Sequence, residues 1–183
     1  MSVIKIMDVN LSNKIAAGEV VERLMNIVKE LVENSIDAKS SEIKIELIES
    51  GLKEIKVTDN GCGMDKNDAK TCLLRHATSK IYDDDDLFNI NSLGFRGEAL
   101  PSIAAVSDVV LKTCMDEVGT LIHIKGGRIL EDKSSDGRRG TVITVTNLFY
   151  NTPVRYKFLK KDFTEAGYIE DTVSRIALVH PEI

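Results

Sequence analysis

The sequence predicts an α+β fold, a two-layer α/β sandwich in which a mixed, mainly antiparallel sheet carries its helices on one face. Two patterns lead to this class. Apolar residues recur at helical spacing near both ends of the chain, whereas the middle holds short Val-, Ile- and Thr-rich segments that alternate apolar and polar residues. With 183 residues and 43% hydrophobic content, the chain is long enough for one domain with a substantial core.

The N-terminal part predicts a long helix, a hairpin and a short helix. Helix formers run from Ser12 to Ala38, and Gly18 is the one expected break. Residues 43–47 and 55–57 alternate as the two strands of an antiparallel hairpin do. Asp65 can then cap a helix that runs to about residue 75, because its carboxylate can accept the free amide hydrogens of the first turn.

The stretch from Ala77 to Gly97 predicts a long, mobile lid. It contains the acidic run Asp83–Asp86 and shows little periodicity, and a loop of this length in a compact domain is usually functional or disordered. A helix over Glu98–Ser107 should follow. It should begin at about Gly97, since Pro101 is tolerated only in the first turn of a helix.

Strands and one more helix are predicted for the rest of the chain. The final helix carries Ile169, Val173 and Ile176 inward over Phe163–Val179. The strands, two of them rich in Val, Ile and Thr, are expected at Val109–Thr113, Gly119–Ile124 and Thr141–Asn147.

Composition excludes several classes of protein. The formal net charge of −5 argues against a surface dominated by phosphate-binding cations, although Arg138-Arg139 and residues 155–161 are candidate local patches. No apolar run approaches the length of a membrane-spanning helix and the N-terminus lacks a signal-peptide layout, so we expect no membrane contact and a cytoplasmic protein. Three unpaired cysteines and three scattered histidines indicate neither a disulfide framework nor a zinc site.

Three polar residues follow one another at helical spacing in the first long helix. Glu30, Asn34 and Asp37 lie on one narrow stripe beside the apolar face. Such a stripe suits a pocket that holds a metal ion and a water: Asn34 can supply an oxygen ligand to Mg²⁺, and Glu30 can take a proton from water. The alternative is that Glu30 pairs with Lys29 or Arg23 in solvent and Asn34 is simply exposed.

Two glycine-bearing segments could complete a nucleotide site. In Asp59-Asn-Gly-Cys-Gly63 the aspartate, at the end of a strand, can accept a hydrogen bond from a base amine, while the glycines let the backbone approach closely. Gly94 to Leu100 places two glycines before a helix start, where free amides form an anion site. The alternative for Asp59–Gly63 is an ordinary Asn-Gly turn, and the alternative for Gly94–Leu100 is an ordinary loop before a helix. No Walker or dinucleotide-binding motif occurs.

Together these segments resemble the GHKL ATPases, the group that includes the gyrase B subunit, heat-shock chaperones and sensor histidine kinases, and most of all the MutL family of mismatch-repair ATPases. The resemblance spans nearly the whole chain and implies the GHKL (Bergerat) ATPase fold. It is carried by Ile15–Arg23, Lys29–Ser35, Asp59–Gly63, Arg75–Lys80, Leu93–Leu100 and Leu148–Pro153.

The resemblance implies ATP and Mg²⁺ as cofactors and a role for each matching residue. Glu30 corresponds to the general base that activates water, Asn34 to the Mg²⁺ ligand, Asp59 to the adenine-reading carboxylate and Thr141 to the threonine that supports it. Backbone amides of the segment from Gly94 to Leu100 would hold the phosphates. The nucleotide-binding residues expected in this way are Asn34, Asp37, Asp59, Gly63, Thr78, Ser79, Lys80, Gly94, Phe95, Arg96, Gly97, Glu98, Ala99, Leu100 and Thr141.

Two positions depart from the family pattern: Leu24 replaces a usual Pro, and Pro101 replaces a usual Ala or Ser. The first should lengthen its helix, and the second could shift the helix that faces the phosphates. The resemblance also implies that residues 1–183 are a GHKL ATP-binding domain truncated before its end and before a second domain, which supplies a lysine to the γ-phosphate. We therefore expect weak or absent ATPase activity from this segment alone.

For the whole protein, the resemblance implies that ATP orders the lid, drives N-terminal homodimerisation and couples mismatch recognition to strand removal. The expected partners are ATP or ADP, a MutS-type mismatch recognition protein, a downstream repair nuclease or helicase, and DNA, weakly for this segment. Two alternatives stay open. One is another GHKL task of the topoisomerase or chaperone type, and the other is a non-catalytic module that binds DNA or a repair partner.

Overall fold

The computed structural model describes residues 5, 7–79 and 97–183. The predicted lid falls almost wholly outside these residues, as do four of the expected phosphate-site residues, Lys80, Gly94, Phe95 and Arg96. The described elements are α1 (Val9–Val20), α2 (Leu24–Asp37), β1 (Ile43–Ile48), the 3-10 turn η1 (Glu49–Gly51), β2 (Glu54–Asp59), α3 (Lys66–Thr71), α4 (Ala99–Val106), β3 (Asp108–Cys114), β4 (Gly119–Lys125), β5 (Arg128–Ser135), β6 (Gly140–Thr146), α5 (Pro153–Phe158) and α6 (Asp162–Val179).

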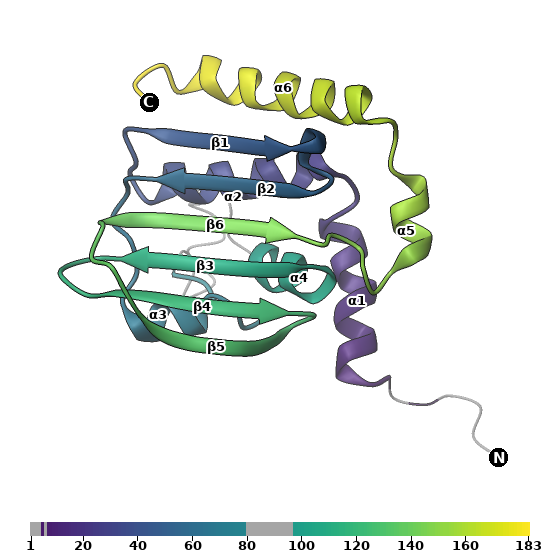
Figure 1. The fold of residues 1–183 in the computed structure, drawn as a ribbon, viewed down its shortest axis with the longest axis horizontal. Coiled ribbons are helices and arrows are strands. Elements are labelled where there is room, and N and C mark those ends of the chain that lie inside the picture. Colours follow the sequence, from purple (N-terminus) through teal and green to yellow (C-terminus); the bar gives the residue numbers. More distant parts are fainter. Residues whose placement is uncertain (1–4, 6, 80–96) are drawn as a thin grey trace, which may run out of the picture.

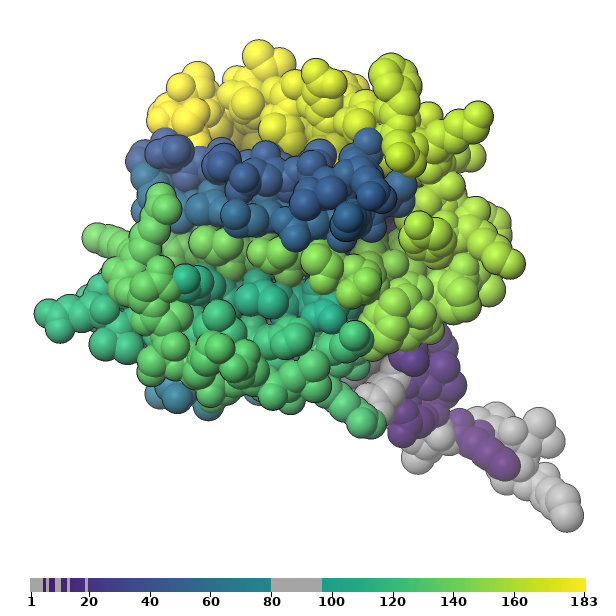
Figure 2. Space-filling view, in the orientation of Figure 1, coloured from purple at the N-terminus to yellow at the C-terminus, as the bar shows by residue number. Residues whose placement is uncertain are grey.

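A single six-stranded sheet in the order β1-β2-β6-β3-β4-β5 forms one layer, and every pairing in it is antiparallel. Helices α2 to α4 lie behind this sheet, α1 stands beside the strand ends near α5, and α6 runs along the β1 edge (Figure 1). The opposite face of the strands forms the surface seen in Figure 2. The α+β, two-layer prediction is confirmed, and the described sheet is antiparallel throughout where a mixed, mainly antiparallel sheet was expected.

The core lies between the sheet and α2. Leu24, Ile27, Val28 and Leu31 repeat at helical spacing, and each is at most 1% exposed. Alternate residues of the central strands, such as those in β3 and β6, face the same layer and are buried. This packing fixes α2 against one face of the sheet. No helix in the described part of the chain is long and apolar enough to cross a membrane.

The break in the first helical region is at residues 21–23, between α1 and α2, and the prediction of a break at Gly18 was wrong. Gly18 lies inside α1, where an added Cβ would overlap the Arg155 guanidinium. The Arg155 Nη2 approaches the Ile15 carbonyl oxygen at 3.5 Å. Gly18 therefore makes room for the Arg155 side chain of α5. This long-range contact cannot be read from the sequence around Gly18.

Besides the short 3-10 turn η1, two elements were not predicted. β5 is an edge strand whose residues are almost all exposed, so it lacks the apolar alternation that identifies a strand. α5 is a six-residue helix with no buried residue and with Pro153 at its start. Both therefore carry little periodic signal.

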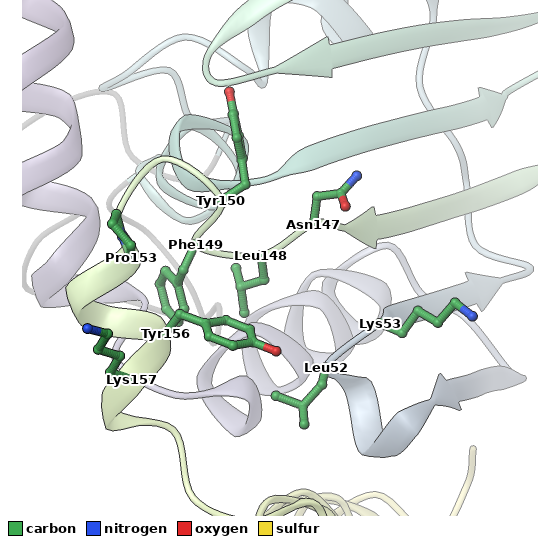
Figure 3. A pocket seen from close by; sticks show the side chains of 9 residues that line it. All are labelled: Leu52, Lys53, Asn147, Leu148, Phe149, Tyr150, Pro153, Tyr156 and Lys157. Carbon is green, nitrogen blue, oxygen red and sulfur yellow. The ribbon is translucent and has the colours of Figure 1, made fainter.

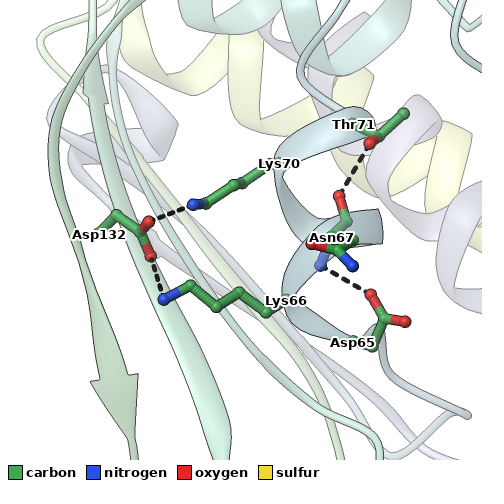
Figure 4. A network of polar contacts seen from close by, with 6 residues as sticks. All are labelled: Asp65, Lys66, Asn67, Lys70, Thr71 and Asp132. Atoms are coloured by element: carbon green, nitrogen blue, oxygen red, sulfur yellow. Dashed lines mark hydrogen bonds and ion pairs between the residues drawn. The ribbon is translucent and has the colours of Figure 1, made fainter.

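Helix α3 confirms the predicted cap. The Asp65 carboxylate accepts hydrogen bonds from the backbone N–H groups of Asn67 at 2.7 Å and Asp68 at 2.8 Å. The helix ends at Thr71, short of the predicted residue 75. Its lysines reach Asp132 on β5, Lys66 at 3.7 Å and Lys70 at 2.5 Å (Figure 4). These ion pairs tie α3 to the β5 edge of the sheet.

Candidate functional site

The carboxylate of Asp59 joins α2 to the sheet. Asp59 is the last residue of β2, where Ser35 of α2 lies 3.0 Å from its Oδ2 atom. Its Oδ1 atom accepts hydrogen bonds from the backbone N–H groups of Gly61 at 2.9 Å and Thr141 at 3.2 Å. Several donors therefore hold the carboxylate in one orientation, and the remaining lone pairs are available to a ligand.

The register of the sheet explains why Asp59 and Thr141 meet, although 82 residues separate them. Asp59 pairs with Thr141 of β6, and Thr141 pairs in turn with Thr113 of β3. The three residues thus form one row across neighbouring strands. The sheet brings together the two residues that the resemblance assigns to the base.

Three glycines allow the chain to fold tightly around this row. A Cβ at Gly61 would meet Ala38 and Ser40 at the end of α2, and a Cβ at Gly140 would overlap the Asp59 carbonyl oxygen. Gly63, with φ of +70°, would overlap the Cys114 carbonyl oxygen. Close packing against the protein itself thus requires glycine at these positions.

Glu30, Asn34 and Asp37 lie on α2 and are all partly exposed. Lys29 Nζ is 3.1 Å from Glu33 Oε1 but 4.0 Å from Glu30 Oε1, so Lys29 is bound chiefly by Glu33. Asn34 precedes Ser35, the residue that contacts Asp59, so the polar stripe lies on the helix that contacts the Asp59 carboxylate.

The two described ends of the predicted lid meet at Gly97. With φ of +60°, Gly97 packs so closely on Ala77 that an added Cβ would overlap the Ala77 carbonyl oxygen. His76 Nδ1 also lies 3.3 Å from Glu98 Oε1. Thr78 and Ser79 directly follow Ala77, so they lie near the start of α4.

Helix α4 begins at Ala99, two residues later than predicted, and Glu98 is its N-cap. Pro101 is its third residue and thus within the first turn, as predicted. The backbone N–H groups of Ala99 and Leu100 have no acceptor within the helix, because a helix leaves its first amides unbonded. Helices α4 and α2 contact each other, so these amides belong to the same helix layer as the polar stripe.

The other end of α4 is held by two loops. Its last carbonyl oxygens accept hydrogen bonds from Gly127 N at 2.9 Å, from Asn151 Nδ2 at 2.8 Å and from Phe149 N at 2.7 Å. Asn151 and Phe149 belong to the Leu148–Pro153 motif, which the sequence singled out without a role. This motif therefore caps and positions α4.

A hollow of about 420 Å³ lies elsewhere, beside the same motif. Leu52 and Lys53 before β2 and Tyr156 and Lys157 of α5 surround it (Figure 3). It borders the start of β2 and the end of β6, whereas Asp59 and Thr141 lie at the opposite ends of these strands. It is therefore not part of the predicted site.

Two hydroxyl residues of the site were missed from the sequence. Ser35 is 3% exposed and contacts Asp59, and Thr113 is 2% exposed and contacts Thr141 at 3.0 Å between their Oγ1 atoms. The spacing of Ser35 on α2 places it on the buried face, next to Asn34. Thr113 becomes visible only when the pairing of β3 with β6 is known.

The three thiols differ in exposure, and this difference allows a test of the geometry. Cys62 is exposed and Cys114 is buried, while burial, with a smaller effect of Asp68, raises the pKa of the Cys72 thiol to about 12. At pH 8 such a thiol is about 0.01% thiolate, the form that reacts. We expect iodoacetamide to alkylate Cys62 at least about a hundredfold faster than Cys72, as measured by peptide mass spectrometry. Equal labelling of Cys62 and Cys114 in the folded protein would contradict the arrangement.

Comparisons with known proteins identify the family to which the chain is similar. A family model described as "Histidine kinase-, DNA gyrase B-, and HSP90-like ATPase" matches residues 22–141. The DNA mismatch repair protein MutL of Bacillus licheniformis is 60% identical over 95% of this chain and 28% of its own length. MutL of a Geobacillus species is 55% identical over 100% of this chain and 30% of its own. The chain thus spans less than a third of these relatives.

Solved structures are similar as well. The Aquifex aeolicus MutL ATPase domain complexed with ADP has a TM-score of 0.69 and 32% identity, covering 90% of this chain and 58% of that one. The N-terminal domain of a DNA repair protein has a TM-score of 0.66 and 34% identity, covering 79% of this chain and 41% of that one.

Proposed function

The chain belongs to the family of histidine kinase-, DNA gyrase B- and HSP90-like ATPases, and on that premise we propose that it is the ATP-binding and ATP-hydrolysing domain of a MutL-type mismatch repair protein. The observation that carries the proposal is the Asp59 carboxylate, oriented by Ser35, Gly61 and Thr141 at the junction of α2 and the sheet. A carboxylate held in this way is suited to accept the exocyclic amine of adenine.

Asp59 and Thr141 read the base, and Gly63 lets the backbone turn tightly beside it. Adenine presents an amine donor where guanine presents a carbonyl acceptor. The carboxylate attracts the first and repels the second, so the pocket selects adenine. Asp37, near the end of α2, borders the same pocket.

Glu30 and Asn34 act on the triphosphate side of α2. The Asn34 side-chain oxygen would hold Mg²⁺, together with nucleotide oxygens and waters, and the ion would neutralise phosphate charge when bound. A single amide ligand fits Mg²⁺, which keeps most of its waters. No cluster of three or more His, Cys, Asp or Glu suited to a metal occurs in residues 7–79 and 97–183. Glu30, one turn away, takes the proton of the attacking water.

The phosphates lie at the start of α4. The free amides of Ala99 and Leu100 and the positive end of the helix dipole attract anions. Gly97 and Glu98 form the turn into this helix, with Thr78 and Ser79 beside them, and Lys80 and Gly94 to Arg96 complete the lid in our proposal. The Leu148–Pro153 motif does not contact the phosphates in this proposal. It positions α4 by binding the carbonyl oxygens at the C-terminal end of that helix.

In the longer MutL-type protein, ATP orders the lid, brings two N-terminal regions together and couples mismatch recognition to strand removal. The partners are a MutS-type recognition protein, a repair nuclease or helicase, and DNA, in the cytoplasm. Residues 1–183 alone turn ATP over slowly, because the resemblance assigns a γ-phosphate lysine to a second domain of the relatives. A steady-state rate equal to that of a longer chain would contradict this last point.

Calorimetric titration with Mg²⁺ and a non-hydrolysable ATP analogue tests the proposal. Asp59→Asn replaces an acceptor with an amide, and we expect a Kd about 10- to 30-fold higher, in line with the loss of a hydrogen bond to a charged group. Asp132→Asn on β5 is the control, because it removes the same charge far from the site and should leave Kd unchanged. Equal affinities of wild type and Asp59→Asn would refute the assignment of the base.

The competing interpretation is a module that binds DNA or a repair partner. Lys157, Lys160 and Lys161 are exposed near α5, as is Phe158 at 76%, and basic residues interleaved with aromatics suit nucleic acid. Arg155 is instead engaged with α1. Such a module would not depend on Glu30, so the Glu30 variant discussed below separates the two functions. The 52–60% identity to MutL proteins disfavours a topoisomerase or chaperone task.

A further inference from the structure

The hydroxyl group of Thr113 stands behind the base-reading residues. Its Oγ1 atom accepts a hydrogen bond from the Met64 backbone N–H at 2.9 Å. The same atom lies 3.0 Å from Thr141 Oγ1 and 3.2 Å from the Gly140 carbonyl oxygen. Thr113 is 2% exposed and Thr141 8%, so bulk water does not compete for these bonds.

The direction of these hydrogen bonds follows from counting protons. A backbone N–H is a donor only, so Met64 fixes Thr113 Oγ1 as an acceptor. The one hydroxyl proton of Thr113 can then go either to Thr141 Oγ1 or to Gly140 O. If it goes to Thr141, the proton of Thr141 is left for the ligand. If it goes to Gly140, Thr141 must point its proton back at Thr113 and faces the ligand as an acceptor.

The two arrangements suit different bases. Adenine presents an amine donor beside a ring nitrogen that accepts a hydrogen bond, whereas guanine presents a carbonyl oxygen beside a ring N–H. With the adenine amine on Asp59, the neighbouring ring nitrogen requires a donor from Thr141, directly or through one water. Thr141 can donate in this way when the Met64 N–H donates to Thr113 and the Thr113 hydroxyl donates to Thr141.

We propose that Thr113 is a positioning residue for base specificity, which donates to Thr141 and thereby makes Thr141 a donor toward adenine. The inference rests on the proposed function, since it assumes that the Asp59 pocket receives a purine. Ser35 and Gly61 orient Asp59 independently of Thr113. Two features of the pocket distinguish adenine from guanine: the Asp59 carboxylate, which accepts from the amine, and the Thr141 hydroxyl, which donates to the ring nitrogen. Loss of the Thr113 hydroxyl therefore removes the second feature and leaves the Asp59 carboxylate in place.

Titration of the chain with non-hydrolysable analogues of ATP and GTP, each with Mg²⁺, tests this role. Thr113→Val keeps the shape of the side chain but removes the hydroxyl. We expect its Kd for the ATP analogue to rise about tenfold and that for the GTP analogue to change little, so that the preference for ATP falls about tenfold. Thr113→Ser should restore the preference.

A matched control is Thr120→Val, which changes a threonine that is 6% exposed and pairs with Thr113 from β4. It should bind both analogues as the wild type does. A Thr113→Val protein that weakens both analogues equally would show a merely structural role and overturn the inference, as would an unchanged preference. A wild type that shows no preference for the ATP analogue would instead overturn the proposed function itself.

If Thr113→Val folds poorly, Thr141→Val provides a second measurement of the same preference for ATP. It leaves the Met64–Thr113 hydrogen bond in place and should lose the same preference for ATP. If both variants fold, the double variant should bind like Thr141→Val alone, because Thr113 acts through Thr141. Additive losses, or a Thr141→Val protein that keeps its preference, would overturn the inference.

Discussion

Replacing Glu30 with Gln is expected to lower ATP turnover by about 10²- to 10⁴-fold, the usual contribution of a general base. The amide keeps the size of the side chain but cannot accept the proton of the attacking water. Nucleotide binding should stay within about twofold of the wild type, since base and phosphate contacts come from other residues. Phosphate release in single-turnover experiments measures the first effect, and calorimetric titration with an ATP analogue measures the second.

The control for this experiment is Glu22→Gln, which removes one carboxylate from an exposed residue in the segment before α2. Glu33 is a poorer control, because its loss would release Lys29 toward Glu30. A Glu30→Gln protein that hydrolyses ATP at the wild-type rate would support the binding-module interpretation and remove Glu30 from the mechanism.

The parts of the fold that were predicted depend on local chemistry. The hairpin of β1 and β2 follows from period-two alternation, and the α3 start follows from the ability of Asp65 to accept two amide hydrogen bonds. The position of Pro101 follows from its missing N–H. Each of these features is decided within a few residues of the chain, so the sequence alone was sufficient.

The parts that were not predicted depend on distant residues. A break was predicted at Gly18, yet this residue lies within α1, where the Arg155 guanidinium of α5 occupies the space that a side chain would fill. β5 was not predicted, because an exposed edge strand needs no apolar face. Local periodicity carries no information about either contact.

The site shows the same division. The resemblance supplied Asp59 and Thr141, and the structure brings these two together. It assigned no role to Ser35 or Thr113, whose roles follow from the packing of α2 on β2 and from the pairing of β3 with β6. Hydrogen-bond partners behind a site are set by strand register, which cannot be read from one sequence without knowing which strands pair.

Replacing Gly63 with Ala is expected to destabilise the domain by about 3 kcal/mol, since the change adds left-handed backbone strain to overpacking. The backbone of Gly63 has a φ of +70°, and the new Cβ would overlap the Cys114 carbonyl oxygen at the end of β3. The loop must then move away from β3. That movement stretches the hydrogen bond from Met64 N–H to Thr113, so the base pocket opens at the same time.

Thermal unfolding and nucleotide titration measure the two consequences of Gly63→Ala. The midpoint should fall by about 6–12 °C for a domain of this size, and the Kd for an ATP analogue should rise at least about tenfold. Gly167→Ala is the control: nothing lies within 4 Å of the added Cβ in α6, and alanine should stabilise a helix interior by up to about 1 kcal/mol. A Gly63→Ala protein as stable as the wild type would mean that Asp59–Gly63 does not pack on β3. The base pocket would then lack the support that holds Asp59, Thr141 and Thr113 in one row.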